Sequence, residues 1–263
     1  MNVELNPIRI YKKYQRRYHA ARLKRIARSY CINGYRRIYH FHSRKTAGTS
    51  IAKIFLSLNG NDGGRLFDEL AQQADRPMLR DGRIFAGWDK RIIESGEYFF
   101  AFSHLCFDDL DLPAGTFRFT SLRDPTDRVL SHYRMLLDFG QLENPHSSFQ
   151  EERHWMGATF SDFLDRIPRQ HLQNQLYMFS QQFDVEQAIE RVSGLEHVVM
   201  FDELADGMKQ LSDKTGIELG LRHDRRGASQ FEIEDGDRVR LKEMLYEEYE
   251  FYDAIKSHVA VST

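Results

Sequence analysis

The feature that most constrains the fold is a short β-prone run that leads through a polar loop into an apolar helical pattern. Residues 37–42, RIYHFH, predict a buried strand. Residues 43–50, SRKTAGTS, form the polar loop, and the residues after it are apolar at helical spacing: Ile51, Ile54, Phe55 and Leu58. Backbone N–H groups and the helix dipole favour an anion at such a strand-to-helix loop. The segment therefore predicts a phosphate-type site.

The rest of the chain alternates between strand and helix patterns. Further strands are expected at 98–103, 117–122 and 197–201. Helices are expected after Asp124-Pro125 and at 160–167, 172–179, 203–214 and 235–256, whereas 59–83 is polar and contains glycine. This alternation predicts an α/β protein with a mostly parallel sheet flanked by helices on both faces.

The amino-terminal segment differs from the rest in charge. Residues 9–37 hold eleven Lys or Arg residues and no Asp or Glu, and three tyrosines fall at helical spacing: Tyr11, Tyr14 and Tyr18. A basic amphipathic helix in peripheral contact with an anionic membrane is one interpretation. The other is a solvated helix whose tyrosines pack on the domain. We assign 1–37 as a basic helical extension and 38–263 as the main domain.

Composition limits the partners and the compartment. The net charge of −2 gives no sign of a nucleic-acid partner. Cys31 and Cys106 have neither metal-binding nor disulfide-framework spacing, which favours a reducing compartment. Residues 1–14 lack the apolar core of a secretory signal, and no run approaches the roughly 20 apolar residues of a membrane helix. We therefore expect a cytoplasmic protein without a bound metal.

The loop carries phosphate-binding groups in an order unlike that of the common nucleotide loop. Lys45 precedes Gly48, and no glycine stands at the loop start, so the pattern G-x-x-x-x-G-K-[ST] is absent. Hydroxyls at Thr46, Thr49 and Ser50 surround the lysine. Ordinary ATP or GTP hydrolysis is disfavoured. The alternative for Lys45 is an exposed lysine in a polar loop.

A second motif follows about 80 residues later. Arg123 ends a predicted strand, Asp124-Pro125 starts a helix, and Ser131 comes eight residues after the arginine, about two helical turns in. An arginine in this position can bind a phosphate through two parallel N–H groups, and the serine hydroxyl can add a donor. The alternative is that Arg123 pairs with Asp127.

Together the two motifs resemble those of the PAPS-dependent sulfotransferases, in particular the heparan and uronyl 2-O-sulfotransferase-like carbohydrate branch. Its loop typically reads HIPKTGGTS, and six of nine positions agree with His42–Ser50. Ala47 replaces the first glycine, which is mild if its φ is negative. Arg44 replaces the proline and either adds a cation near the donor or points to solvent. The family's strand that ends in L-R-D-P, followed by a serine, matches Arg123 and Ser131.

The resemblance implies a P-loop-NTPase-like fold, PAPS as donor and no required metal. It places the 5′-phosphosulfate on residues 44–50 (Arg44, Lys45, Thr46, Ala47, Gly48, Thr49 and Ser50) and the 3′-phosphate on Arg123 and Ser131. His104, in the context S-H-L-C-F, matches the family's strand-end general base; the alternative is a structural histidine. Residues 174–176, NQL, resemble an element near the donor, and residues 225–227, RRG, suggest a lid or a solvated loop.

The sequence thus predicts transfer of the PAPS sulfuryl group to an acceptor hydroxyl, with Lys45 and His104 as catalytic residues. The acceptor implied by the resemblance is a glycan or glycolipid. Two alternatives stay open: a nucleotide-dependent kinase with a degenerate phosphate loop, and a non-catalytic nucleotide-binding protein.

Overall fold

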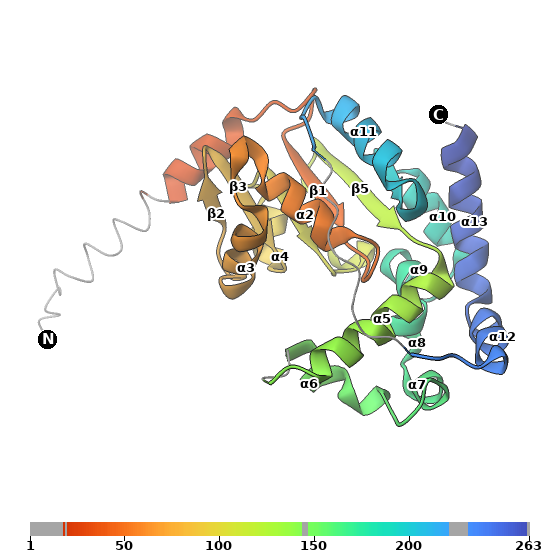
Figure 1. The fold of residues 1–263 in the computed structure, drawn as a ribbon. Coiled ribbons are helices and arrows are strands. Elements are labelled where there is room, and N and C mark those ends of the chain that lie inside the picture. The colour runs from red at the N-terminus through yellow and green to blue at the C-terminus, as the bar shows by residue number, and fades with distance from the viewer. Residues whose placement is uncertain (1–17, 19, 144–146, 221–230, 262–263) are drawn as a thin grey trace, which may run out of the picture.

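A six-stranded sheet forms the centre of the protein. The computed structural model describes residues 18, 20–143, 147–220 and 231–261 (Figure 1). The strand order is β2-β3-β4-β1-β5-β6, and every pair is parallel except β2 with β3. The strands are β1 Arg37–Phe41, β2 Met78–Arg80, β3 Arg83–Gly87, β4 Phe100–Ser103, β5 Thr116–Leu122 and β6 His197–Met200. The predicted α/β class with a mostly parallel sheet is confirmed.

Helices cover both faces of the sheet. One face packs on α2 Gly48–Leu56, α3 Gly63–Gln72 and α11 Leu204–Thr215. The other packs on α4 Lys90–Ser95, α9 Asn174–Phe179, α10 Val185–Ser193 and α13 Tyr246–Val261. Because both faces are buried, the central strands are nearly continuous in apolar side chains, as parallel strands require.

A smaller helical layer lies beyond the carboxyl ends of the strands (Figure 1). It has its own apolar cluster, centred on Tyr133, Trp155 and Phe163. Its helices are α5 Pro125–Gly140, α6 Ser147–Glu152, α7 Phe160–Arg166, α8 Arg169–Leu172 and α12 Asp235–Met244. This layer faces the edge of the sheet from which the predicted site residues emerge.

The described part of the amino-terminal segment belongs to the core. Residues 20–29 are helical, and Leu23 and Ala27 are buried against the sheet face that carries α10 and α13. Tyr30 Oη donates to Gly82 O and accepts from Ile84 N, both at 2.9 Å. The helix thus packs on the domain through Leu23 and Ala27, but the prediction that the tyrosines do so is wrong for Tyr18, whose side chain is 74% exposed. Tyr11 and Tyr14 lie outside the described residues.

Two expectations for individual elements were wrong. The polar stretch 59–83 contains α3 and β2, and β3 begins at its end. The single helix expected at 235–256 is two helices, α12 and α13, separated at Leu245. The break has a physical reason: Leu241 and Leu245 pack into the helical layer, whereas Phe251 and Ile255 pack against the sheet. Within the described residues, no helix is both long and apolar enough to span a bilayer.

Candidate functional site

The predicted site residues meet at the carboxyl edge of three neighbouring strands. Phe41, the last residue of β1, aligns with Ser103 of β4 on one side and Thr120 of β5 on the other. The loop after β1, His104 after β4 and Arg123 after β5 therefore leave the sheet side by side. Ligands of parallel α/β sheets bind at this edge.

The loop backbone has the form of an anion-binding nest. Lys45 has a φ of 68° and Ala47 a φ of 73°, and Thr46 between them has no positive φ. Alternating right- and left-handed residues turn successive N–H groups toward one point, where they bind anions. The negative φ that would make Ala47 a mild replacement is therefore not found. Alanine in this region costs about 1–2 kcal/mol, which explains the family's glycine at this position.

Gly48 is required by the close approach of His42. A Cβ built on Gly48 would lie 1.8 Å from His42 Cδ2, inside the buried imidazole. Only glycine leaves space for that ring, and the ring sets the path of the loop. Glycine at position 48 therefore leaves room for the His42 ring, and it is also the first residue of α2.

His104 is held in the tautomer that suits a general base. Its Nδ1 lies 2.6 Å from the carbonyl oxygen of His42. A carbonyl only accepts, so Nδ1 carries the proton and Nε2 keeps its lone pair. His104 keeps some surface exposed to solvent, but many protein atoms surround the ring and remove most of its water. This desolvation lowers the pKa of His104 to about 4, and the hydrogen bond to His42 opposes the shift. At neutral pH the ring is an uncharged proton acceptor.

The Thr46 side chain stabilises the loop, a role that the sequence does not predict. Its hydroxyl is fully buried, lies 2.8 Å from Ser43 O and 3.0 Å from Ser121 Oγ, and so joins the loop to β5. The side chain therefore faces protein, contrary to the expected donor-facing hydroxyl, and only its backbone N–H suits an anion. Thr49 and Ser50 stand in the first turn of α2 and are partly exposed.

Arg44 is anchored away from both expected positions. Its guanidinium pairs with Glu152, and its backbone N–H donates to Asn174 Oδ1 at 2.9 Å. Glu152 is buried and also lies 2.8 Å from His132 Nε2. Burial raises the pKa of Glu152, but hydrogen bonds from His132 and Arg44 outweigh it and bring the pKa to about 2. Arg44 thus ties the loop to α6 and neither points to solvent nor is available to the donor.

Two cations at this edge have no partner among the described residues. Lys45 Nζ and the Arg123 guanidinium make no hydrogen bond or ion pair there, and Arg123 Nε is buried without a partner. Arg123 instead packs over the Phe201 ring, 4.3 Å from its centroid. Arg123 makes no hydrogen bond or ion pair with Asp127, although this carboxylate opposes the lowering of the Arg123 pKa by burial. Both residues are partly buried, and cations removed from water normally have partners, so these two favour an external anion.

The electrostatics of Lys45 point the same way. Burial lowers the pKa of Lys45 to about 8, helped by Arg123, Arg44 and Arg134 and opposed by Asp138. Arg134 was not predicted, although it follows Ser131 by three residues and so shares its side of α5. That spacing is the signal that sequence reasoning missed. Ser131 is partly exposed, and within the described residues no hydrogen bond joins it to Arg123 or the loop.

Two adjacent residues of α9 connect both motifs. Asn174 accepts from the Arg44 N–H, as described above. Gln175 Oε1 accepts from Arg123 N at 2.7 Å, and Gln175 Nε2 donates to Arg123 O at 3.0 Å. The same Nε2 donates to Glu248 Oε1 at 2.9 Å, so α13 supports the arrangement. The NQL element therefore contacts the backbone of both motifs, whereas 225–227 lies outside the described residues.

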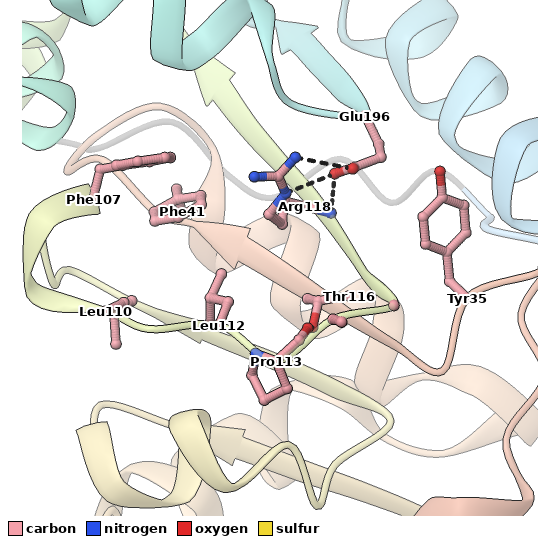
Figure 2. Close-up of a pocket in the computed structure, with 11 residues that line it drawn as sticks. Tyr35, Phe41, Phe107, Leu110, Leu112, Pro113, Thr116, Arg118 and Glu196 are labelled. Carbon is pink, nitrogen blue, oxygen red and sulfur yellow. Dashed lines mark hydrogen bonds and ion pairs between the residues drawn. The ribbon is translucent and has the colours of Figure 1, made fainter.

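A surface pocket of about 330 Å³ lies elsewhere, beside the amino-terminal half of β5 (Figure 2). Its main polar side chains already pair: Arg118 Nε lies 3.1 Å from Glu196 Oε2, and Arg118 N donates to the same oxygen at 2.7 Å. The rest of its side-chain lining is largely apolar, including Phe41, Phe107 and Leu112. Because its charged side chains already pair with each other and it lies away from the carboxyl ends of the strands, the candidate site remains the carboxyl edge.

The described residues contain no group of three or more His, Cys, Asp or Glu side chains arranged to hold a metal ion. A scan against protein-family models and a search of curated proteins found no match to this chain. The interpretation of the site therefore rests on its geometry and on the motif resemblance.

Proposed function

We propose that the protein transfers the sulfuryl group of PAPS to an acceptor hydroxyl, most simply one carried by a sugar. The observation that carries this proposal is the combination at one sheet edge of two unpartnered cations, Lys45 and Arg123, with the base-form imidazole of His104. Two separate cationic positions suit a donor with two separate anionic groups. The parallel sheet and its strand-to-helix loop are compatible with the P-loop-like fold of this enzyme class.

In this proposal, the donor lies across the ends of β1 and β5. The nest at residues 45–47 receives the 5′-phosphosulfate, and the Arg123 guanidinium receives the 3′-phosphate with help from Ser131 and Arg134. The backbone hydrogen bonds from Gln175 hold Arg123 in place without contacting the donor. Ser131 and Arg134 lie on one side of α5 and so approach the nucleotide from the helical layer.

The chemical step follows from the state of His104. Nε2 accepts the proton of the acceptor hydroxyl while the oxygen attacks sulfur. The new O–S bond forms as the bond between sulfur and the bridging oxygen of the donor breaks, and the nucleotide leaves as PAP. Negative charge grows on that bridging oxygen, where the Lys45 ammonium stabilises it. A protonated lysine is needed for this role, and a pKa of about 8 leaves most of Lys45 charged at pH 7.

The test is calorimetric titration with PAP and, separately, with ATP and Mg²⁺. We expect PAP to bind without metal and ATP to bind at least tenfold more weakly. His104→Ala should bind PAP like the wild type but lose transfer of radiolabelled sulfuryl to glycosides, because the base does not hold the donor. Tight ATP–Mg²⁺ binding without PAP binding would instead support the kinase alternative. PAP binding without any transfer by the wild type would support a non-catalytic protein, and equal transfer by the wild type and His104→Ala would exclude His104 as the base.

A further inference from the structure

An aromatic surface stands next to the candidate base, at the end of the neighbouring strand. Trp88 directly follows β3, and Gly87 of β3 aligns with Phe102 of β4, two residues before His104. Ring contacts continue from the base to this residue. The His104 and His42 centroids are 4.4 Å apart, those of His42 and Phe102 6.2 Å, and those of Phe102 and Trp88 5.0 Å. Trp88 and His104 thus share one edge of the sheet and are connected by a row of tilted and edge-on ring contacts.

Trp88 has a backbone conformation that is strained for a large residue. Its φ is 60°, a conformation that glycine adopts freely and a bulky residue rarely does. Its N–H donates to Phe102 O at 3.2 Å, which holds the strained turn against β4. Backbone strain of this kind at a large residue is typical of functional positions.

The Trp88 side chain is only partly covered. Phe67 and Phe102 pack edge-on against the indole, with centroids 5.8 and 5.0 Å away. The indole N–H makes no hydrogen bond among the described residues, and it is not one of the buried polar atoms that lack a partner. The indole N–H is therefore open to solvent, next to partly exposed ring surface. An aromatic ring with an open polar group suits a ligand that is apolar on one face and rich in hydroxyls.

The order of the strands fixes the side on which the acceptor must lie. Along the carboxyl edge the sequence is Trp88 on β3, His104 on β4, the anion-binding loop on β1 and Arg123 on β5. If the donor covers β1 and β5, its sulfuryl end faces β4. The attacking oxygen approaches in line, opposite the leaving nucleotide, and so it comes from the β3 side. Trp88 is the aromatic residue at that end of the row.

We infer that Trp88 is an acceptor-binding residue that stacks on the C–H face of a hexopyranose and presents one ring hydroxyl to His104 Nε2. This inference rests on the proposed function and specifies its acceptor. A sugar hydroxyl is a weak acid and needs a positioned base, whereas a phenol already loses its proton easily. The presence of a neutral histidine in base form beside Trp88 therefore favours the sugar over a flat phenol.

The chain offers a clean probe, because it contains two tryptophans and the other, Trp155, is buried. In a Trp155→Phe background, Trp88 is the only tryptophan. With PAP bound, we titrate the methyl pyranosides of glucose, galactose, N-acetylglucosamine and glucuronic acid, and 2-naphthol separately. At least one pyranoside should change the Trp88 emission saturably and protect it from acrylamide quenching. No response to any pyranoside, or a response to 2-naphthol alone, overturns the inference.

Kinetic variants separate this role from folding. Trp88→Ala should raise the KM for the responding pyranoside about tenfold and leave the Kd for PAP unchanged. Trp88→Phe keeps a ring and should raise that KM only about threefold. Trp88→Gly should lose acceptor affinity as Trp88→Ala does. It should melt at a higher temperature than Trp88→Ala, since glycine relieves the strained φ. An unchanged KM in Trp88→Ala refutes the inference. A failure of wild-type PAP binding would instead refute the proposed function, independently of Trp88.

Discussion

The depressed pKa of Lys45 predicts that donor binding depends on pH in a way that one substitution removes. With a pKa of about 8, Lys45 in the free protein is about 90% protonated at pH 7 and about 10% at pH 9. A bound polyanion restores the pKa toward its ordinary value, so binding takes up a proton. The Kd for PAP should therefore weaken about tenfold from pH 7 to pH 9, or about 1.4 kcal/mol. At pH 8, titrations in buffers of different ionisation enthalpy should report about half a proton taken up per PAP.

The matched variant is Lys45→Arg, because arginine keeps its charge across this range. Its Kd should stay flat from pH 7 to pH 9, whereas Lys45→Met should bind weakly at both values. A flat profile in the wild type contradicts the assignment of Lys45 to the donor. A tenfold decline that persists in Lys45→Arg contradicts it equally, since another group would then be titrating.

Four further outcomes are expected. Arg123→Lys should weaken PAP binding about tenfold in calorimetry, because lysine cannot reproduce two parallel hydrogen bonds. Equal affinity would contradict the assignment of the 3′-phosphate to Arg123. Gln175→Ala should weaken PAP binding and lower the free energy of unfolding, measured in urea, by about 1–3 kcal/mol, because the backbone groups of Arg123 lose their partner. An unchanged affinity for PAP would show that α9 does not support the donor site. Burial lowers the pKa of His40 to about 3, so only the unfolded chain binds this proton between pH 6.5 and 3. Stability should thus fall from pH 7 to pH 5, with about 2 kcal/mol of the fall absent in His40→Gln but present in the exposed control His154→Gln; equal falls would refute it. Ala47→Gly should raise the unfolding free energy by about 1 kcal/mol, and a loss of stability would show that the positive φ is not strained.

Sequence patterns predicted the parts of the fold that depend on local periodicity. The strand before the loop and the strand before Arg123 were found within one residue, because apolar β-prone runs mark buried parallel strands. β2 and β3 were missed because their apolar runs, Met78–Leu79 and Ile84–Ala86, are shorter than the runs at 98–102 and 198–201 that mark β4 and β6. The break between α12 and α13 was missed because both halves are apolar on one side, and only the tertiary structure assigns them to different clusters.

The same distinction holds for the site. Chain order placed Lys45, His104 and Arg123 at strand ends, and parallel pairing brings such ends together. The role of Arg44 could not be predicted, since Glu152 is 108 positions away in the chain. The Gln175 contacts are to backbone atoms, which leave no trace in residue type. The φ of Ala47 is set by the loop as a whole and contradicts what its side chain prefers.

The contact between Gln175 and Glu248 has a consequence for how the protein is made. Glu248 lies in the last described helix, while the Arg123 backbone that it supports through Gln175 is near the middle of the chain. During synthesis, the phosphate loop and Arg123 leave the ribosome long before Glu248 does. A nascent chain therefore has all the side chains that we propose to bind the donor outside the ribosome, but it lacks Glu248, which supports the position of Arg123 through Gln175. Donor affinity should appear late in translation, as a single step, and it would report completed synthesis of α13 better than the presence of the sheet does.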